Sequence, residues 1–172
     1  MIEVRMLDGE AAPGFAGELA AVLLDCVEGG ASIGFMASLT LAEAREFYDV
    51  VCAEVAAGRR ILLAAFAGGE LVGSVQVVLA ALPNGMHRGE IAKMLVRRSV
   101  RRQGVAAALI ERAEGEALAA GKTLLVLDAV TDGDAARLYA RLGWTSVGEV
   151  PGFALFPDGA PCSTTYFYKQ LT

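Results

Sequence analysis

Four arginines and a glycine lie close together in the middle of the chain, within residues 97–104. They follow the apolar run 91–96, which predicts a β-strand, and they precede a long stretch of helical spacing that begins at Gly104. A strand that runs into a helix through a basic loop with a glycine is typical of an anion site, because unpaired backbone N–H groups and the helix dipole point at the ligand. The sequence therefore predicts a phosphate site here; the alternative is a solvated run of charge.

The glycine pattern of this loop differs from two well-known phosphate-binding motifs. The dinucleotide pattern Gly-x-Gly-x-x-Gly is absent, and so is the Gly-Lys-Ser/Thr of a P-loop. The loop carries Arg101-x-x-Gly104-x-Ala106 instead. Gly104 lets the backbone approach a ligand closely, and Ala106 keeps the start of the helix small. We therefore favour a phosphate ligand that is bound outside those two motif classes.

Two acidic residues belong to the predicted strands before and after this loop. Glu90 opens the strand before the loop, and Asp128 lies late in the apolar run 123–130. An acid in an apolar strand is costly unless it is paired, so Asp128 favours a functional role. A carboxylate at either position could accept the proton of an ammonium group, directly or through water. The alternative is a structural ion pair, for which the candidates are Lys93, Arg88 and Arg137.

The elements that must position these residues follow from periodicity and from turn signals. They give the order β-α-α-β-β-β-α-β-α-β-β and an α/β or α+β domain with a mixed sheet. Thr40 and Glu43 have the spacing of a capping box at the start of the second helix. The expected strands are 2–7, 61–66, 71–79, 90–96, 123–130, 153–156 and 164–169, and the expected helices begin near residues 15, 40, 104 and 134.

The composition of the chain limits the number of domains and the classes of partner that we expect. A chain of 172 residues with 55% hydrophobic side chains can bury a full core, so we expect a single domain over residues 1–172. The net charge of −5 argues against a general binder of nucleic acid or of anionic membranes. No apolar run is long enough for a membrane span, and no secretion signal is visible, so a cytoplasmic location is expected. Three widely spaced cysteines and a single histidine argue against a disulfide framework and against a metal site.

Three segments together resemble the GNAT superfamily of acyl-CoA-dependent N-acyltransferases. The segment 101–106 is similar to that family's Arg/Gln-x-x-Gly-x-Gly/Ala motif, which wraps the CoA pyrophosphate. The segment 132–144 is similar to the family's Asn-x-x-Ala-x-x-Leu-Tyr-x-x-x-Gly-Phe pattern, although Asp132 replaces the asparagine. The segments 87–96 and 157–169 resemble the tabtoxin-resistance-type acetyltransferases within that superfamily. The resemblance covers nearly the whole chain, and it implies a mostly antiparallel, twisted sheet flanked by helices.

The resemblance also implies roles for individual residues, with acetyl-CoA as co-substrate and without a metal. Tyr139 matches the tyrosine that acts as general acid near the CoA sulfur, whereas its helical spacing alone favours core packing. Glu90 and Asp128 are the candidates for accepting the proton of the amine. The residues implied in CoA binding are Met94, Leu95, Val96, Arg101, Arg102, Gln103, Gly104, Val105, Ala106 and Ala107.

The activity implied is acetyl transfer from acetyl-CoA to the primary amine of a small molecule, amino-acid-like or toxin-like, by direct attack in a ternary complex. Toxin resistance is the biological role that the resemblance suggests. A non-catalytic acyl-CoA-binding module or sensor, and a protein N-acetyltransferase, are the alternatives. We expect no nucleic-acid or membrane partner, and a homodimer is compatible with the sequence. Acceptor contacts are expected from variable segments such as the loop 29–39.

Overall fold

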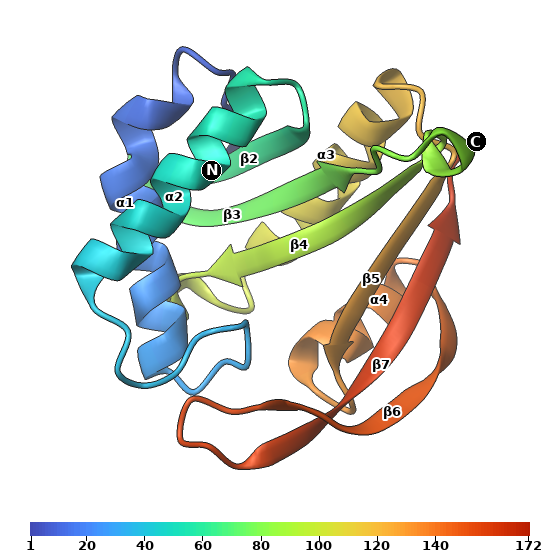
Figure 1. Ribbon diagram of the computed structural model, residues 1–172. Helices are drawn as coiled ribbons and strands as arrows, with labels where there is room; N and C mark the ends of the chain where they lie inside the picture. The colour runs from blue at the N-terminus through green and yellow to red at the C-terminus, as the bar shows by residue number, and fades with distance from the viewer.

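The computed structural model describes residues 1–172 as one seven-stranded sheet with helices on both faces (Figure 1). The strand order across the sheet is β1-β2-β3-β4-β5-β7-β6. The strands are β1 (Ile2–Met6), β2 (Arg60–Ala67), β3 (Glu70–Leu79), β4 (Arg88–Val96), β5 (Leu124–Val130), β6 (Thr145–Leu155) and β7 (Pro161–Gln170). The helices are α1 (Ala12–Glu28), α2 (Leu41–Ala56), α3 (Val105–Ala119) and α4 (Asp134–Arg141), and two short 3-10 turns cover Pro83–Gly85 and Arg98–Val100.

The element order is the one predicted from the sequence, and the sheet is mixed as expected. Every neighbouring pair of strands is antiparallel except β4 and β5, which run parallel. A parallel pair needs a crossover connection, and α3 supplies it. The strand order places this parallel pair near the middle of the sheet. Because β4 ends at Val96, the loop that carries the arginines begins directly after that strand.

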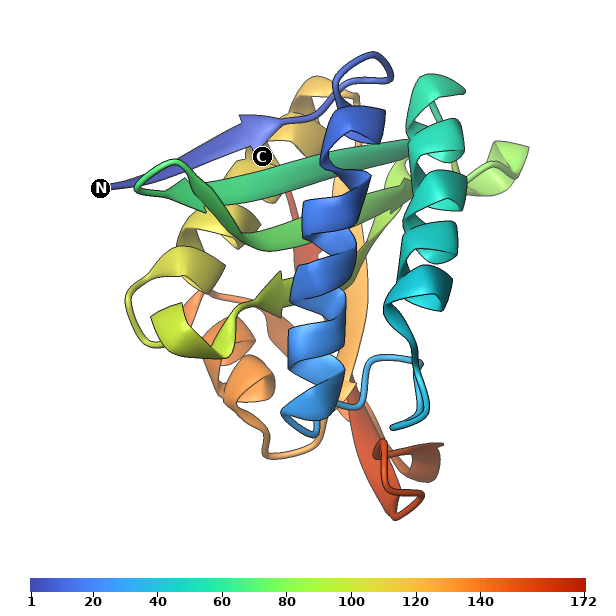
Figure 2. The same cartoon turned by 90° about the vertical axis from the view of Figure 1, so that its left-hand side faces the viewer.

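Each face of the sheet has its own apolar core. One cluster of 18 buried residues joins α1 and α2 to the sheet, and Figure 2 shows these two helices side by side over β2 and β3. The second cluster, also of 18 residues, lies under α3 and α4 on the opposite face. No helix is both long and apolar enough to cross a membrane. The helices α1 and α2 leave β5 and β7 uncovered on their face, so that part of the sheet stays open (Figure 1).

The capping box at Thr40 is confirmed. The Glu43 backbone N–H donates to Thr40 Oγ1 at 3.2 Å, and the Thr40 backbone N–H donates to the Glu43 carboxylate at 2.8 Å. These two bonds satisfy donors that a helix start otherwise leaves unpaired. Helix α2 consequently begins at Leu41. The capping box also fixes the position of Thr40, the last residue of the loop 29–40.

The strand predicted at 153–156 is only the end of a longer one. β6 begins at Thr145 and runs for 11 residues, nearly all of them exposed. As the edge strand it pairs with β7 alone, and two register shifts interrupt that pairing. A strand with no buried face shows no alternation of apolar and polar residues, so the sequence carries no signal for its first part.

Candidate active site

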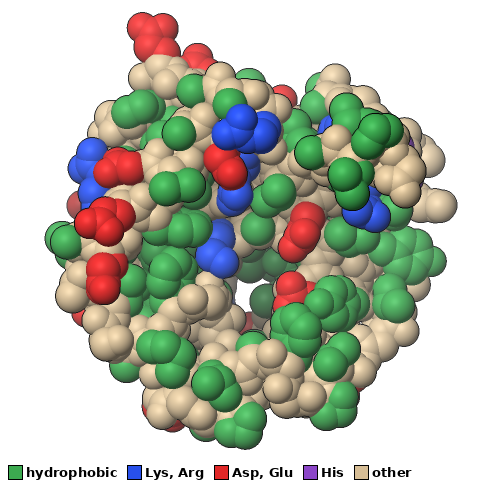
Figure 3. All heavy atoms as spheres, in the orientation of Figure 1, with side chains coloured by type: hydrophobic (Ala, Val, Ile, Leu, Met, Phe, Trp, Pro, Cys, Tyr) green, Lys and Arg blue, Asp and Glu red, His purple; other side chains and the backbone are tan.

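The two parallel strands separate in the middle of the sheet. β4 and β5 are paired at three positions only, from Arg88 opposite Leu124 to Glu90 opposite Val126. Beyond Glu90, β4 continues along β3 and β5 continues along β7, but not along each other. Figure 3 shows a hollow at this place in the same view, with Lys or Arg atoms on one side and Asp or Glu atoms on the other. The backbone groups on the facing edges of these two strands are therefore available to a ligand.

A β-bulge in β4 lies where the strands separate. Ser74 of β3 pairs with Leu95, but Gln76, two residues on, pairs with Ala92, so β4 contains one extra residue. The bulge contains Lys93, whose φ of 49° is left-handed and unusual for a lysine. The bulge turns the backbone of β4 at the point where a ligand would meet its free edge.

Glu90 and Asp128 lie on the same face of the sheet. Glu90 is opposite Val126 on the neighbouring strand, and Asp128 is two residues further along, on the same side because side chains alternate. Both carboxylates are exposed on the open face. Asp128 accepts a hydrogen bond from Thr164 Oγ1 at 2.8 Å, and Thr164 lies on β7. The structure therefore brings the two predicted acids together and gives one of them a hydroxyl that orients it.

Neither acid forms the structural ion pair that was the alternative. The ion pairs of the protein lie elsewhere, and none of them includes Glu90 or Asp128. Arg137 pairs with Asp134 at 2.7 Å and also donates to the Asp132 carbonyl. The two carboxylates thus remain open to a ligand.

Tyr139 lies across the sheet from these carboxylates, on α4. Its ring is 4% exposed and packs against Trp144 and Phe167, with ring centres 5.7 and 6.0 Å apart. The Tyr139 hydroxyl has no hydrogen-bond partner in the protein, and it is not among the fully enclosed polar atoms. Burial raises the pKa of Tyr139, and the nearby charge of Asp128 raises it further. The side chain therefore packs in the core and also presents a protonated, unpaired hydroxyl on the side of β5.

The start of α3 presents a row of unpaired donors. Gly104 caps the helix with a φ of 85°, and no side chain caps it. The first backbone bond of the helix runs from Ala108 N to Gly104 O, whereas the N–H groups of residues 102–107 have no acceptor in the protein. A Cβ added at Gly104 would meet nothing within 4 Å. Six consecutive donors beside open space at a helix N-terminus fit the pyrophosphate of CoA.

The four arginines of the loop divide into anchoring residues and one free residue. Arg98 pairs with Asp25 of α1 at 2.9 Å, and its backbone N–H donates to the same carboxylate. Arg97 and Arg101 donate to backbone carbonyls, at 3.1 and 3.3 Å. Arg102 is exposed and has no partner. The contacts of Arg97, Arg98 and Arg101 therefore anchor the loop, and Arg102 is the arginine that stays free; the phosphate site remains a prediction.

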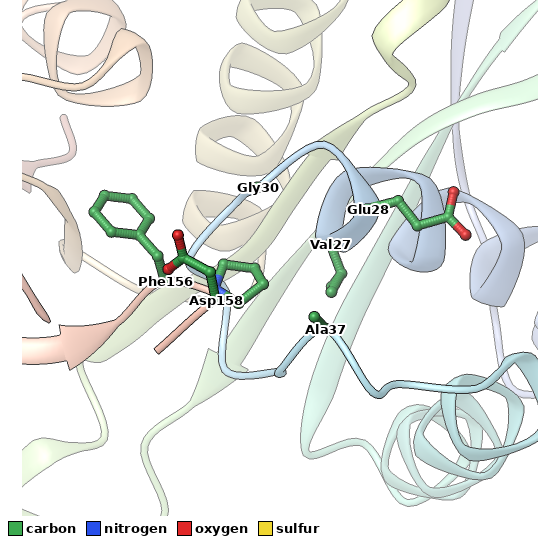
Figure 4. Close-up of a pocket in the computed structure, with 7 residues that line it drawn as sticks. Val27, Glu28, Gly30, Ala37, Phe156 and Asp158 are labelled. Carbon is green, nitrogen blue, oxygen red and sulfur yellow. The ribbon is translucent and has the colours of Figure 1, made fainter. Parts of the chain in front are cut away.

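Two segments that are far apart in the sequence, the loop 29–40 and the β6–β7 hairpin, contact each other. Ser32 Oγ donates to the Leu155 carbonyl at 2.7 Å, and the Ala37 N–H donates to the Pro157 carbonyl at 3.0 Å. The loop 29–40 therefore touches the hairpin between β6 and β7. A cavity of about 340 Å³ lies at this contact, and Figure 4 shows its lining residues. It is lined by Val27, Glu28, Gly30, Ala37, Phe156, Pro157 and Asp158.

The family model described as Acetyltransferase (GNAT) family matches residues 32–144. The chain belongs to the GNAT family. The match begins in the loop 29–40 and ends at Trp144, so it includes β4, the start of α3 and Tyr139. The prediction of an acetyl-CoA-dependent acetyltransferase is thereby confirmed at the level of the family. Separately, the structure contains no group of three or more His, Cys, Asp or Glu side chains that could hold a metal ion.

Solved structures of low sequence identity share the GNAT fold over the full chain. A GNAT-family acetyltransferase from Streptococcus pneumoniae is 22% identical, with a TM-score of 0.80 and coverage of 99% of both chains. A structure from Salmonella typhimurium that contains its cofactor acetyl-CoA is 18% identical, with a TM-score of 0.81 over 100% of this chain and 95% of that one. A ribosomal-protein-alanine N-acetyltransferase from Brucella melitensis is 18% identical, with a TM-score of 0.79 over 98% and 99%. The predicted fold class is confirmed.

The sequence does not identify Thr164 and Lys93 as candidate site residues. Thr164 was not named, because its contact with Asp128 depends on the pairing of β5 with β7. For Lys93, the sequence shows a single lysine within the apolar run 91–96, which by itself indicates no more than an ion pair. Thr164 donates a hydrogen bond to Asp128, and the charges of Asp128 and Glu90 act on Lys93.

Proposed function

We propose that this GNAT protein transfers the acetyl group of acetyl-CoA to the primary amine of a small, amino-acid-like or toxin-like molecule, by direct attack in a ternary complex. One observation carries the proposal. Two carboxylates without an ion pair, Glu90 of β4 and Asp128 of β5, lie on the open face of the sheet, and Tyr139, whose phenol has no hydrogen-bond partner, lies on the other face. A general acid on one face of the sheet and a general base on the other, at the place where β4 and β5 separate, suit a reaction in which the amine and the thioester meet between these strands.

The donor half of the proposal concerns the loop before α3 and the free edge of β4. When bound, acetyl-CoA supplies an activated acetyl thioester. The unpaired N–H groups of residues 102–107 and the guanidinium of Arg102 would bind its pyrophosphate. The free edge of β4 at Met94, Leu95 and Val96 would align the pantetheine arm. Arg101 would support this loop through the Val96 carbonyl.

The acceptor half concerns Glu90 and Asp128. An amine attacks only after it has lost its proton, so a carboxylate within reach of the ammonium group is required. Both acids are free of ion pairs, and Thr164 holds Asp128 by a hydrogen bond of 2.8 Å. Either side chain can accept the proton directly or through water. Tyr139, whose phenol is kept protonated by burial, would donate a proton to the departing sulfur.

The finer assignments belong to the same proposal. Paired acids at positions 90 and 128 support the tabtoxin-resistance type, and with it a role in toxin resistance. One sheet contains all strands, which supports a single domain over residues 1–172. All three cysteines are free, which is typical of a reducing compartment such as the cytoplasm. The exposed edge of β6 is a surface on which a homodimer could form.

Two alternative functions would use only some of these residues. A protein N-acetyltransferase would need an acceptor side that admits a peptide, whereas the contacts of Ser32 and Ala37 with the β6–β7 hairpin narrow that side. A non-catalytic acyl-CoA sensor would use the start of α3 but would have no need of Glu90, Asp128 and Tyr139. We therefore favour an enzyme with a small acceptor.

A thiol-release assay tests this proposal. The protein is incubated with acetyl-CoA and a panel of small primary amines, with N-terminal peptides as a separate arm, and free CoA is followed with a colorimetric thiol reagent. We expect CoA release that depends on a small amine and an N-acetyl product in the mass spectrum. Release with peptides alone would support the protein acetyltransferase. Binding of acetyl-CoA without amine-dependent release would support the sensor.

A further inference from the structure

Lys93 is the one lysine of the protein without a partner. Lys122 Nζ donates to the Met86 carbonyl at 2.6 Å, and Lys169 Nζ is 2.7 Å from the Glu114 carboxylate. Lys93 Nζ makes neither a hydrogen bond nor an ion pair. It lies 5.8 Å from the ring centre of Phe35 and 5.9 Å from that of Phe47. The ammonium group is therefore held against two aromatic rings, with no anion in contact.

The charge of Lys93 is costly in this position. Burial lowers the pKa of Lys93, and the positive charge of Arg60 lowers it further. The charges of Asp128 and Glu90 oppose this effect from beyond ion-pair distance. A desolvated ammonium group with no anion in contact destabilises a fold, and the cation–π contacts compensate for part of that cost only. An anionic group of a ligand would remove the rest of this free-energy cost.

The loop 29–40 lies against this ammonium group through Phe35 and Gly34. Gly34 has a φ of 93°, and a Cβ added there would lie 3.4 Å from Lys93 Nζ. The absence of a side chain at Gly34 leaves space directly against the ammonium group. A carboxylate that binds Lys93 would enter beside this glycine.

A second unpaired donor lies on the strand next to Lys93. Gln76 is fully buried, and its Nε2 is the one enclosed side-chain polar atom without a hydrogen-bond partner. Gln76 is paired with Ala92, the residue before Lys93. Its Oε1 accepts from Arg60, the cation that acts on Lys93. Arg60 is itself paired with the Glu54 carboxylate, so the groups of this stretch that lack a partner are Gln76 Nε2 and the Lys93 ammonium group.

We propose that Lys93 binds the carboxylate of the acceptor, and that the acceptor is an α-amino acid or a close analogue. The inference rests on the proposed function, because it places the amine of the same molecule at Glu90 and Asp128. Two carboxylates and one ammonium group on one open face complement a zwitterion with a short separation between its charges. Lys93 is then the residue that distinguishes an amino acid from a simple amine.

The test compares each amino acid with its own amide. The L-amino acids and the corresponding L-amino acid amides are assayed as acceptors with wild-type protein and with Lys93→Met, which keeps an unbranched side chain of similar size but removes the charge. We expect wild-type kcat/KM to be at least about tenfold higher for the free acids, a margin typical of a charge-assisted contact. In Lys93→Met we expect that ratio to fall to within about threefold, with the amides largely unchanged.

A control variant and a stability measurement separate binding from a structural role. Lys169→Met removes an ammonium group from the opposite face of the sheet, so it should leave the acid-to-amide ratio unchanged. Because Lys93 lacks a partner in the free protein, Lys93→Met should not lower the melting temperature. A lower melting temperature, with equal losses for acids and amides, would mean that Lys93 only supports the two carboxylates and would overturn the inference.

Binding distinguishes failure of this inference from failure of the proposed function. N-acetyl-L-amino acids and their amides are titrated by calorimetry into protein with CoA, which needs no turnover. We expect the carboxylates to bind wild-type protein and to lose most of their affinity in Lys93→Met. Equal affinity for acids and amides in wild-type protein overturns the inference, whatever the assay shows. Absence of turnover together with selective carboxylate binding contradicts the proposed function alone.

Discussion

Tyr139 packs in the core, and it is also the residue that we propose as the general acid. Its ring packs against Trp144 and Phe167, while its hydroxyl has no partner in the protein. We expect Tyr139→Phe to lower kcat by about 100-fold, within the range typical of a lost general acid, because only the proton donor is removed. The melting temperature and the affinity for acetyl-CoA should stay nearly the same, since the ring remains. Steady-state kinetics, calorimetry and thermal unfolding measure the three quantities.

The pH dependence gives a second check on Tyr139. Because burial raises its pKa above the usual value of about 10, the phenol stays protonated throughout the range in which the protein can be assayed. Activity in the wild type should therefore not fall through loss of this proton up to about pH 9.5. An unchanged kcat in Tyr139→Phe, with the chemical step shown to be rate-limiting, would refute the assignment.

Asp128 and Glu90 differ in their surroundings, so their variants should differ too. Asp128 is oriented by Thr164, whereas Glu90 has no side-chain partner. If Asp128 takes the proton, Asp128→Asn should lower kcat/KM by at least about 100-fold, and Thr164→Val by less, since the carboxylate remains. Glu90→Gln is the matched comparison and should cost less. A larger loss in Glu90→Gln than in Asp128→Asn would assign the base to Glu90 instead.

The sequence predicted residues whose role depends on their own type and position in the chain. Asp128 is predicted because an acid in an apolar strand is costly unless it is paired, and Glu90 because it opens the strand before the basic loop; the structure places both on one face. Thr164 was not identified, because hydroxyl residues are common in strands and its role depends on a cross-strand contact. The missing partner of Lys93 is likewise visible only when all its neighbours are in place.

At the scale of elements, the start of α3 is the feature that we expect to determine donor binding. Gly104 has a φ of 85° and open space around it. We expect Gly104→Ala to weaken acetyl-CoA binding by at least about tenfold, because the new methyl group occupies the space beside the free N–H groups. The left-handed backbone should also cost about 1 kcal/mol of unfolding free energy. Calorimetry and urea unfolding measure these two effects.

Gly121 provides the matched control for Gly104. It ends α3 with a φ of 77°, and a Cβ added there would also meet nothing within 4 Å. Gly121→Ala should therefore lose a similar amount of unfolding free energy and keep its affinity for acetyl-CoA. Equal losses of affinity in both variants would mean that strain in α3, and not the space at its start, explains the result.

The loop 97–104 is anchored to α1 by the pair of Arg98 with Asp25. Partial burial opposes ionisation of Asp25, but the hydrogen bonds and charge of Arg98 outweigh it and lower the pKa of Asp25. A lowered folded-state pKa means that the stabilisation is complete above the unfolded-state pKa of about 3.9 and is lost as the pH falls below it. Asp25→Asn should therefore lower the unfolding free energy at pH 7 by about 0.5–1 kcal/mol, and by less at pH 3.

Glu28 is the control for this pair. It lies 3.6 Å from Arg98, and its side chain is 60% exposed, so Glu28→Gln should change the unfolding free energy at pH 7 by no measurable amount. Urea unfolding of both variants at the two pH values makes the comparison. An Asp25→Asn effect that stays constant between pH 7 and pH 3 would show that the pair does not act through ionisation.

Elements with a buried face were predicted well, and the edge of the sheet was not. The capping box fixed the start of α2, and the apolar runs located β2 to β5 to within two residues. The first part of β6 was missed because it packs against nothing and is held by β7 alone. An exposed edge strand depends on its neighbour for its conformation, so its own residues carry little information about it.

At the scale of the molecule, the net charge of −5 does not show how the basic and acidic residues are distributed. The basic loop lies at the start of α3, where Arg98 is neutralised by acids of α1 and Arg102 remains free. The two carboxylates lie on the open face at the separation of β4 and β5, with Tyr139 behind them. Donor and acceptor would thus approach the same gap from different sides, which is the central claim of our proposal.

A crystal structure with a non-hydrolysable acetyl-CoA analogue tests that claim most directly. We predict that the pyrophosphate is bound by the N–H groups of residues 102–107 and that the sulfur lies between β4 and β5. The Tyr139 hydroxyl should be within about 3.5 Å of that sulfur, and Glu90 and Asp128 should face the acetyl group from the open side. An analogue bound away from the β4–β5 gap, or a Tyr139 hydroxyl out of reach of the sulfur, would contradict the account.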